Sequence, residues 1–330
     1  MTDFTELPDL ASERLGGAVL AASDEFFAPK EALLRPGAPE WREGEYTERG
    51  KWMDGWETRR HSDGEDWCVV RLGAPGIVRG IVVDTTHVRG NFPEACSAEV
   101  CALPAPAPLD ALEAAAWVEI LPRTPLHGDA PNLMGVETEL RATHLRLRIF
   151  PDGGVARLRV HGEVVPEWTR FARGGGEVDL AALENGGRVV ACSCMFYGRA
   201  ENMILPGRSV MMRDGWETRR RRGAGHEWAV LRLAAPGAIH RVEIDTDHFL
   251  GNAPERCTLE AVHAPGASAE ELASAPWRTL LAETTLLPHA RHRFEELASA
   301  VPATHVRIAI HPCGGIARLR LFGTLSEGAR

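Results

Sequence analysis

The heptapeptide Asp54-Gly-Trp-Glu-Thr-Arg-Arg60 occurs twice in this chain, because residues 214–220 repeat it letter for letter as Asp214-Gly-Trp-Glu-Thr-Arg-Arg220. The segments that follow the two copies recur in the same order, at a spacing that stays close to 161 residues. They are Asp84-Thr-Thr-His87 with Asp245-Thr-Asp-His248, Gly90-Asn-Phe-Pro93 with Gly251-Asn-Ala-Pro254, and residues 153–159 with residues 314–320. A period this long indicates a duplicated domain, since solenoid repeats have periods of about 20–50 residues.

The duplication sets the domain count. A chain of 330 residues has the length of about two domains. We expect a first repeat over residues 1–165, a linker over 166–177 and a second repeat over 178–330. Pro166 and the run Gly174-Gly-Gly176 are typical of a flexible link, which is why the boundary is placed there.

Alternation of polar and apolar residues predicts strands. The stretches 143–149 and 156–161 alternate clearly, as half-buried strands of antiparallel sheets do. Residues 67–72 and 77–84 are read as two further short strands. Helix is minor: residues 110–117 and 268–274 are short candidates, and Ser268 and Glu271 are spaced as a capping box. The pattern favours an all-β class with a sandwich or barrel in each repeat.

Composition excludes several classes of partner. The formal net charge of -9 argues against nucleic acid. No apolar run approaches the roughly 20 residues that span a bilayer, and the acidic start lacks the features of a signal peptide, so we expect no membrane and a cytoplasmic location. Seven cysteines without a Cys-x-x-Cys pattern favour small buried side chains in a reducing compartment. The only lysines are Lys30 and Lys51, which makes Schiff-base chemistry improbable.

The ordered double match resembles the allantoicase repeat, from about residue 9 to residue 325. The resemblance implies a hydrolase that converts allantoate to ureidoglycolate and urea in purine and allantoin degradation. It also implies two tandem jelly-roll-like β-sandwich domains of the galactose-binding-domain-like kind, with minor short helices. The partner is then a small molecule, allantoate, and we further expect a homo-oligomer.

The repeated heptapeptide holds the first candidate site residues. Glu57 is a candidate acid or base, and Arg59 or Arg60 has the fork geometry that grips a carboxylate bidentately. The second-repeat copies Glu217, Arg219 and Arg220 are expected to bind substrate as well. The alternative is a structural Glu–Arg network that ties this loop to the sandwich.

The following motifs offer an acid–base group and an amide. His87, oriented by Asp84, is a catalytic candidate at a strand end, although a capped turn explains Asp-x-x-His equally well. Asn91 and Asn252 have the donors and acceptors that a ureido group needs, with an Asx turn as the alternative. No cofactor is certain, and a divalent metal such as Mn²⁺ at the histidine stays open. Four arginines that alternate with apolar residues are expected to face solvent: Arg157, Arg159, Arg318 and Arg320.

The two repeats are not chemically equivalent. The first contains Asp24, Glu25 and Asp152, where the second has Cys194, Met195 and Cys313, so we favour the first repeat for chemistry. Two rival functions remain. One is a tandem carbohydrate- or ligand-binding module without catalysis, because fold does not fix function. The other is a hydrolase of another ureido compound.

Overall fold

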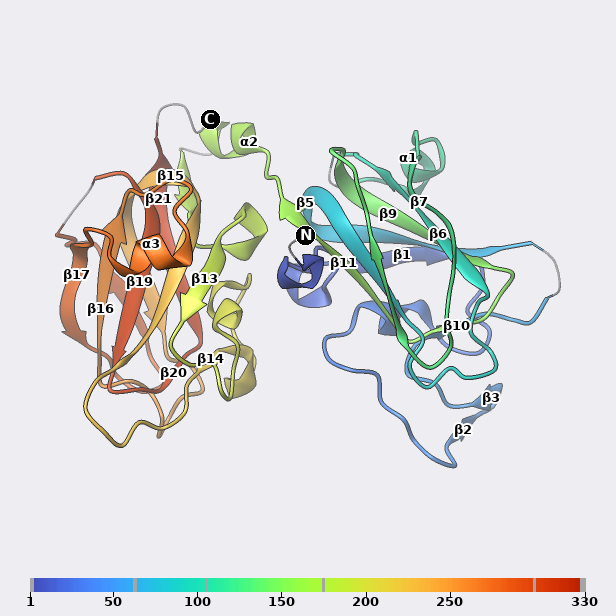
Figure 1. Cartoon of the computed structure of the whole chain (residues 1–330), viewed down its shortest axis with the longest axis horizontal. Helices are drawn as coiled ribbons and strands as arrows, with labels where there is room; N and C mark the ends of the chain where they lie inside the picture. The colour runs from blue at the N-terminus through green and yellow to red at the C-terminus, as the bar shows by residue number, and fades with distance from the viewer. Residues whose placement is uncertain (1–2, 62–63, 105, 174–175, 299–300, 327–330) are drawn as a thin grey trace. The chain divides into compact units, whose positions relative to one another are not determined.

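The protein consists of two compact units, residues 1–165 and residues 166–330, each formed mainly of antiparallel strands (Figure 1). The computed structural model describes every residue except 1–2, 62–63, 105, 174–175, 299–300 and 327–330. The all-β prediction of two tandem sandwich-like domains with only short helices is confirmed.

In the first unit, the main path of hydrogen-bonded strands runs β1-β5-β9-β6-β7, and β8 and β11 also pair with β5. Two small ribbons, β4 with β10 and β2 with β3, are separate from this path. The strands are β1 Ala18–Ala22, β2 Tyr46–Thr47, β3 Gly50–Lys51, β4 Trp56–Glu57, β5 Asp66–Asp84, β6 Ala95–Cys101, β7 Val118–Pro125, β8 Pro131–Gly135, β9 Arg141–Phe150, β10 Gly154–Val155 and β11 Arg157–Val164.

Strand β5 explains how one continuous ladder folds into two layers. Its first part pairs with β1 and β9, whereas its second part pairs with β11 and β8. The register with β9 shifts between Arg71 and Gly76, where the sequence reads Gly-Ala-Pro. A strand that changes sheet through such a bend forms the corner of a sandwich. The two strands expected at 67–72 and 77–84 are therefore one strand.

The second unit repeats this topology along the path β12-β21-β15-β19-β16-β17, with β13 and β18 on β15 and the ribbon β14-β20 apart. The strands are β12 Glu177–Asp179, β13 Arg188–Cys192, β14 Trp216–Glu217, β15 Glu227–Asp245, β16 Arg256–Val262, β17 Arg278–Thr285, β18 Arg291–Phe294, β19 Ala303–His311, β20 Gly315–Ile316 and β21 Arg318–Leu325.

The described helices are all short. The α-helices are α1 Leu109–Glu113, α2 Trp168–Arg173 and α3 Ala269–Ala273, and the 3-10 turns are η1 Phe4–Glu6, η2 Glu13–Leu15, η3 Lys30–Leu34, η4 Leu183–Asn185, η5 Ala200–Ile204 and η6 Met212–Asp214. The capping box of Ser268 and Glu271 is present at the start of α3. No helix in the described part of the chain is long and apolar enough to cross a membrane. Within the stretch expected to be a linker, α2 occupies residues 168–173, and Gly174 and Gly175 lie outside the described residues.

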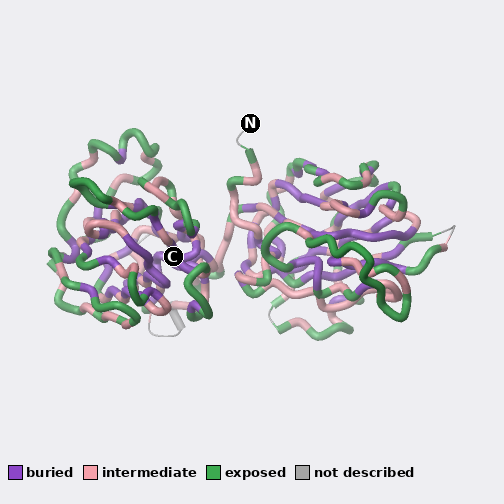
Figure 2. Tube along the Cα trace, turned by 90° about the horizontal axis from the view of Figure 1, so that it is seen from below, coloured by how far each residue is buried: buried purple, intermediate pink, exposed green. Residues whose placement is uncertain are grey.

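The buried residues follow the strands of each unit, as the purple segments of Figure 2 show. Trp56 and Trp216 are fully buried. The expectation that Arg157 and Arg318 face solvent is wrong, since both are buried. Loop residues cover this side of β11: the guanidinium of Arg157 donates to the carboxylate of Asp54 and to the backbone of Ala38.

Candidate functional site

The first copy of the heptapeptide is held in place by a small ribbon. Strand β4 pairs with β10, so that Glu57 lies opposite Gly154 and Trp56 opposite Val155. Gly55 is required here, because a Cβ atom would lie 2.6 Å from the carbonyl oxygen of Val155. The amide of Gly154 in turn donates to the carbonyl of Asn91 at 2.8 Å. This ribbon brings three motifs that are far apart in sequence to one end of the unit.

Glu57 is the central acidic group of this loop cluster. Its side chain is buried, and its Oε1 accepts a hydrogen bond from Nδ2 of Asn91 at 2.5 Å. Burial raises the pKa of Glu57; the hydrogen bond from Asn91 and the charge of Arg60 lower it, and the negative charge of Asp152 raises it further. Since the net direction is upward, the site favours a protonated carboxyl more than water does.

Arg60 links Glu57 to a second buried carboxylate. Its Nη1 donates to Oδ1 of Asp152 at 3.1 Å, and its Nη2 lies 3.8 Å from Oε1 of Glu57. The other oxygen of Asp152 accepts from the backbone amide of His61 at 2.7 Å. Asp152 is 4% exposed, so the structure fixes both ends of this network.

A cavity of about 550 Å³ opens beside Glu57. Glu57, His87 and Asn91 all line it, so three of the predicted residues come together on one surface. Much of the lining comes from the segment between η3 and the heptapeptide, in particular Trp41 and Lys51. The Nζ of Lys51 lies 4.0 Å from the centre of the Trp41 ring, a cation–π contact.

His87 and Asp84 belong to the same turn, but only His87 lines the cavity. His87 has a left-handed backbone with φ of 70°, and its amide donates to Oδ1 of Asp129 at 2.8 Å. Its ring lies 5.7 Å from that of Trp41 on the cavity wall. Asp84 instead accepts from the amide of Thr86 at 2.8 Å, which is the contact of a capped turn, and it is not among the residues that line the cavity.

Arg59 and Arg60 also lie outside the cavity lining. The guanidinium of Arg59 stacks 4.5 Å from the centre of the Phe26 ring, and its amide donates to Oδ1 of Asp24 at 2.8 Å. Arg60 approaches the cavity only through its contact with Glu57. Glu57, His87 and Asn91 therefore line the cavity together, whereas Arg59 and Arg60 do not line it.

Sequence reasoning did not identify Lys51 as a site residue. Within the described part of the chain it makes no ion pair, and it lines the cavity as a cation without a carboxylate partner. The feature of the sequence that could have pointed to Lys51 is a difference in length between the repeats. The first repeat has nineteen residues, 35–53, where the second repeat has nine, 205–213. That longer segment, called the insertion below, contains Trp41 and the β2–β3 ribbon.

The second repeat preserves the ribbon but changes its surroundings. Asn252 donates to Oε1 of Glu217 at 2.6 Å, as Asn91 does to Glu57. The same amide of Asn252 also contacts the sulfur of Met212 at 3.3 Å. The Nε2 of His248 lies 3.0 Å from the backbone carbonyl of Ser209, so this ring is engaged by the shorter loop.

Two cysteines replace the two aspartates of the first repeat. The backbone amides of Arg219 and Arg221 donate to the sulfur atoms of Cys194 and Cys313, each at 3.2 Å. The backbone positions are thus preserved, whereas the negative charges are lost. Arg220, the counterpart of Arg60, is exposed and has no acidic residue at the position of Asp152.

The described residues contain no group of three or more His, Cys, Asp or Glu side chains arranged to hold a metal ion. The suggestion of a divalent metal such as Mn²⁺ at His87 stays open, without a group of three such ligands among the described residues.

Comparison with known proteins gives one consistent result. The model of the allantoicase repeat matches residues 8–165 and again residues 178–326. A protein named probable allantoicase 1, from Burkholderia mallei (strain ATCC 23344), is 49% identical over 323 residues, which are 97% of this chain and 95% of that protein. A probable allantoicase of Pseudomonas aeruginosa (strain UCBPP-PA14) is 46% identical over 325 residues, 97% of each chain. The crystal structure of allantoicase from Saccharomyces cerevisiae is 32% identical, with a TM-score of 0.80, and the match covers 96% of this chain and 92% of that one.

Proposed function

The chain belongs to the allantoicase family, and from that premise we propose that it hydrolyses allantoate to ureidoglycolate and urea. One observation supports the first repeat as the place of reaction. Glu57, a buried carboxyl with a raised pKa, lies on the wall of a cavity that also presents an amide, an imidazole and an unpaired ammonium group.

Allantoate is a small anion whose central CH carbon carries one carboxylate and two ureido groups. In the proposed reaction the bond between this carbon and one ureido nitrogen breaks, the nitrogen takes up a proton, and urea leaves. A water oxygen forms a bond to the same carbon and gives up one proton, which yields ureidoglycolate. One proton is donated and one is accepted, so the enzyme ends in its starting state.

Glu57 suits both proton transfers. Because its pKa is raised, Glu57 keeps its proton to a higher pH than a free glutamate does, and the protonated form can donate to the leaving nitrogen. The carboxylate that results can then accept the proton of the attacking water. Arg60 and Asn91 hold the carboxyl in one orientation, since both contact Oε1. His87, on the same cavity wall, is the second candidate for proton transfer, and Asp84 supports its turn.

Two groups are proposed to bind the substrate itself. Lys51 would hold the carboxylate, because it is the cavity-lining cation without an acidic partner in the described residues. Asn91 donates its amide to Glu57 and so directs its Oδ1 to other donors, such as the N–H groups of a ureide. Arg59 is left to support the loop. Whether Glu217, Arg219, Arg220 and Asn252 contact substrate stays a prediction.

The decisive assay measures urea and ureidoglycolate released from allantoate by the purified, folded protein. It is run as purified, with a chelator, and with added Mn²⁺. We expect equimolar urea and ureidoglycolate. Absence of both products in all three conditions would reject the proposed function, and activity that the chelator removes would reject a mechanism based on side chains alone.

We also propose that the protein is a homo-oligomer, on the evidence of exposed apolar side chains in the loops of the second unit near the heptapeptide, called the rim below. The rim consists of side chains that are 40–73% exposed: Met195, Phe196, Tyr197, Val210, Met211, Met212, Leu250 and Leu287. Exposed apolar patches of this kind mark protein interfaces. The first repeat has Glu25, Arg89 and His127 where the rim has Met195, Leu250 and Leu287.

A second copy of the chain is the proposed occupant of the rim. The insertion exposes Trp41 and Tyr46 among four exposed glutamates, whereas the rim is flanked by the exposed Arg219 and Arg220. Light scattering after size-exclusion chromatography tests this. Leu250→Arg, which restores the first-repeat residue, should lower the particle mass, and Leu133→Arg, at an exposed leucine outside the rim, should not. A wild-type monomer would contradict the proposal.

We propose a cytoplasmic location as well, because all seven cysteines are free thiols. Fractionation of the producing cells, with cytoplasmic and envelope marker enzymes, tests it; enrichment with the envelope markers would contradict it.

A further inference from the structure

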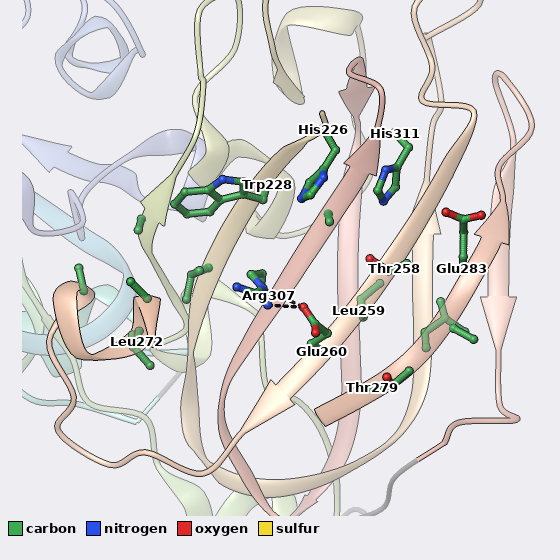
Figure 3. A pocket seen from close by; sticks show the side chains of 17 residues that line it. His226, Trp228, Thr258, Leu259, Glu260, Leu272, Thr279, Glu283, Arg307 and His311 are labelled. Carbon is green, nitrogen blue, oxygen red and sulfur yellow. Dashed lines mark hydrogen bonds and ion pairs between the residues drawn. The ribbon is translucent and has the colours of Figure 1, made fainter. Parts of the chain in front are cut away.

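The second repeat contains a cavity of about 690 Å³ that shares no residue with the candidate site (Figure 3). Its floor is formed by β15, β16, β17 and β19, and residues of α3 close one side. His226 and His311 lie near each other at one end of the cavity, and Trp228 projects from β15. Arg307 of β19 pairs with Glu260 of β16 across the floor. The volume falls in the range of about 300–1,000 Å³ that is typical of small-molecule sites.

The duplication reveals how this cavity is opened. At the matching face of the first repeat, Arg148 forms ion pairs with Glu65 and with Glu99. Arg123 stacks 4.3 Å from the centre of the Phe150 ring. In the second repeat these long side chains are replaced: Ala309 stands for Arg148, His226 for Glu65, and His311 for Phe150. The side chains that cover this face in one repeat are therefore absent in the other.

The charges of the cavity are internally neutralised. Arg307 donates to Oε2 of Glu260 through Nε at 2.9 Å and through Nη2 at 2.6 Å. Glu283 accepts from Nη1 of Arg256 at 2.6 Å. Burial and the neighbouring His226 lower the pKa of His311, which keeps that imidazole neutral near pH 7. A charged ligand would enter without a counter-charge, so the lining suits an uncharged one.

Hydrogen-bonding capacity remains unused in the same place. The Nε2 atom of His311 is buried and has no hydrogen-bond partner among the described residues. The ring centroids of His226 and His311 are 4.8 Å apart. With the indole of Trp228, they give the cavity three flat rings, and Thr258 lies near His311 (Figure 3). An unpaired buried polar atom is costly, and a ligand that pairs with it recovers that cost.

We propose that this cavity binds an uncharged, flat heterocycle with amide-like edges. The aromatic rings offer faces and edges for stacking against such a ring. The imidazole nitrogen of His311 and the hydroxyl of Thr258 offer partners for its N–H and C=O groups. The site is independent of the proposed hydrolysis of allantoate, since none of its residues belongs to the candidate site.

The test uses hypoxanthine as the probe, in isothermal titration and in ligand-observed NMR with the whole protein. Galactose and orotate serve as comparison ligands: galactose is uncharged but not flat, and orotate is flat but anionic. We expect a saturable isotherm for hypoxanthine with one site per chain and a Kd below about 1 mM. We expect galactose and orotate to bind at least tenfold more weakly.

Variants place the binding in this cavity. Ala309→Arg puts the first-repeat side chain where Glu260 can pair with it, and His311→Phe removes the unpaired nitrogen. Each should weaken hypoxanthine binding at least tenfold and leave urea release from allantoate unchanged. Ala114→Arg, which adds the same charge at an exposed position in the first repeat, should not affect binding. The proposal is overturned if hypoxanthine does not bind the wild type, if Ala309→Arg binds it as well as the wild type does, or if galactose or orotate binds equally well.

Discussion

Arg60 reaches Asp152 across ninety-two positions of sequence, with Nη1 and Oδ1 3.1 Å apart, and the second repeat has a cysteine at the matching position. Asp152 therefore does two things for Glu57. Its charge raises the pKa of Glu57, and its hydrogen bond draws the positive charge of Arg60 away from that carboxyl. The two repeats therefore differ at this pair, although both keep the glutamate.

Replacement of Asp152 by Asn should move the pH dependence of hydrolysis. Loss of the negative charge lowers the pKa of Glu57, and Arg60, once released, lowers it further. If protonated Glu57 is the acid, the alkaline limb of the kcat/KM profile shifts to lower pH. The measurement is a full pH–rate profile of both proteins. A limb that stays in place, or moves upward, would show that Glu57 does not determine it.

The two glutamates provide a matched pair of variants. Glu57→Gln should reduce kcat/KM about thirty-fold or more, because the loss of a charged group from a buried site costs about 2–5 kcal/mol and each 1.4 kcal/mol is tenfold. Glu217→Gln should have a much smaller effect. Steady-state kinetics of folded variants decide this. Small effects from both would exclude catalysis by either glutamate, and a larger loss from Glu217→Gln would move the site to the second repeat.

Lys51 can be separated from the rest of the insertion. Lys51→Met should raise KM for allantoate about tenfold to a hundredfold, as expected when a charged hydrogen bond of about 1.5–3 kcal/mol is lost. Lys51→Arg should bring KM for allantoate part of the way back to the wild-type value. Arg42→Met is the control, because Arg42 stacks on Trp52 in the same segment but does not line the cavity. A KM unaffected by Lys51→Met would assign the carboxylate to another group.

Glu57 should also weaken the fold at alkaline pH. Its folded pKa is raised, so the folded state binds a proton that the unfolded state has already lost, and the stability falls as pH rises from the unfolded pKa through the folded one. Glu57→Gln should therefore gain stability relative to the wild type as the pH increases from 5 to 8. Urea denaturation of both proteins across this range is the test; a difference independent of pH would contradict the argument.

Breaking the buried pair of Asp54 and Arg157 should strongly destabilise the first unit. Burial acts to raise the pKa of Asp54, but the hydrogen bonds from Arg157 and Glu40 outweigh it, so that the pKa is lowered. Asp54→Ala leaves the buried guanidinium without its partner and should cost about 3–5 kcal/mol. Asp214→Ala should cost less, since Asp214 lies at a more exposed position than Asp54. Thermal unfolding of the two variants is the comparison, and equal losses would contradict it.

The duplicated sequence was enough to predict the class of fold and to single out residues that the structure brings together. Alternation along β9 and β11 reports which side chains face the core, and the repeated motifs marked Glu57 and Asn91, which the structure joins in one hydrogen bond. The same alternation gave the wrong result for Arg157, because a period of two cannot tell solvent from a covering loop. In the structure that loop places Asp54 on the guanidinium.

The arginine that contacts Glu57 was also beyond the reach of the pattern. An extended heptapeptide would place Glu57 and Arg59 on the same side, but β4 ends at Glu57, and the backbone then turns so that Arg60 is the one that comes near. Lys51 was missed because the insertion has no periodicity of its own; its position depends on contacts made only after folding, such as the stacking of Lys51 on Trp41.

The insertion also bears on how the two repeats of a duplicated domain came to differ in structure. Lengthening a loop from nine to nineteen residues is about one doubling, and each doubling of loop length costs only about 0.6 kcal/mol of closure entropy. The added segment contributes Lys51 and Trp41 to the cavity of the first repeat. Its cost in loop-closure entropy is smaller than the contribution of a typical hydrogen bond to stability. Grafting residues 35–53 in place of residues 205–213 is a direct way to ask whether the second repeat can then form a comparable cavity.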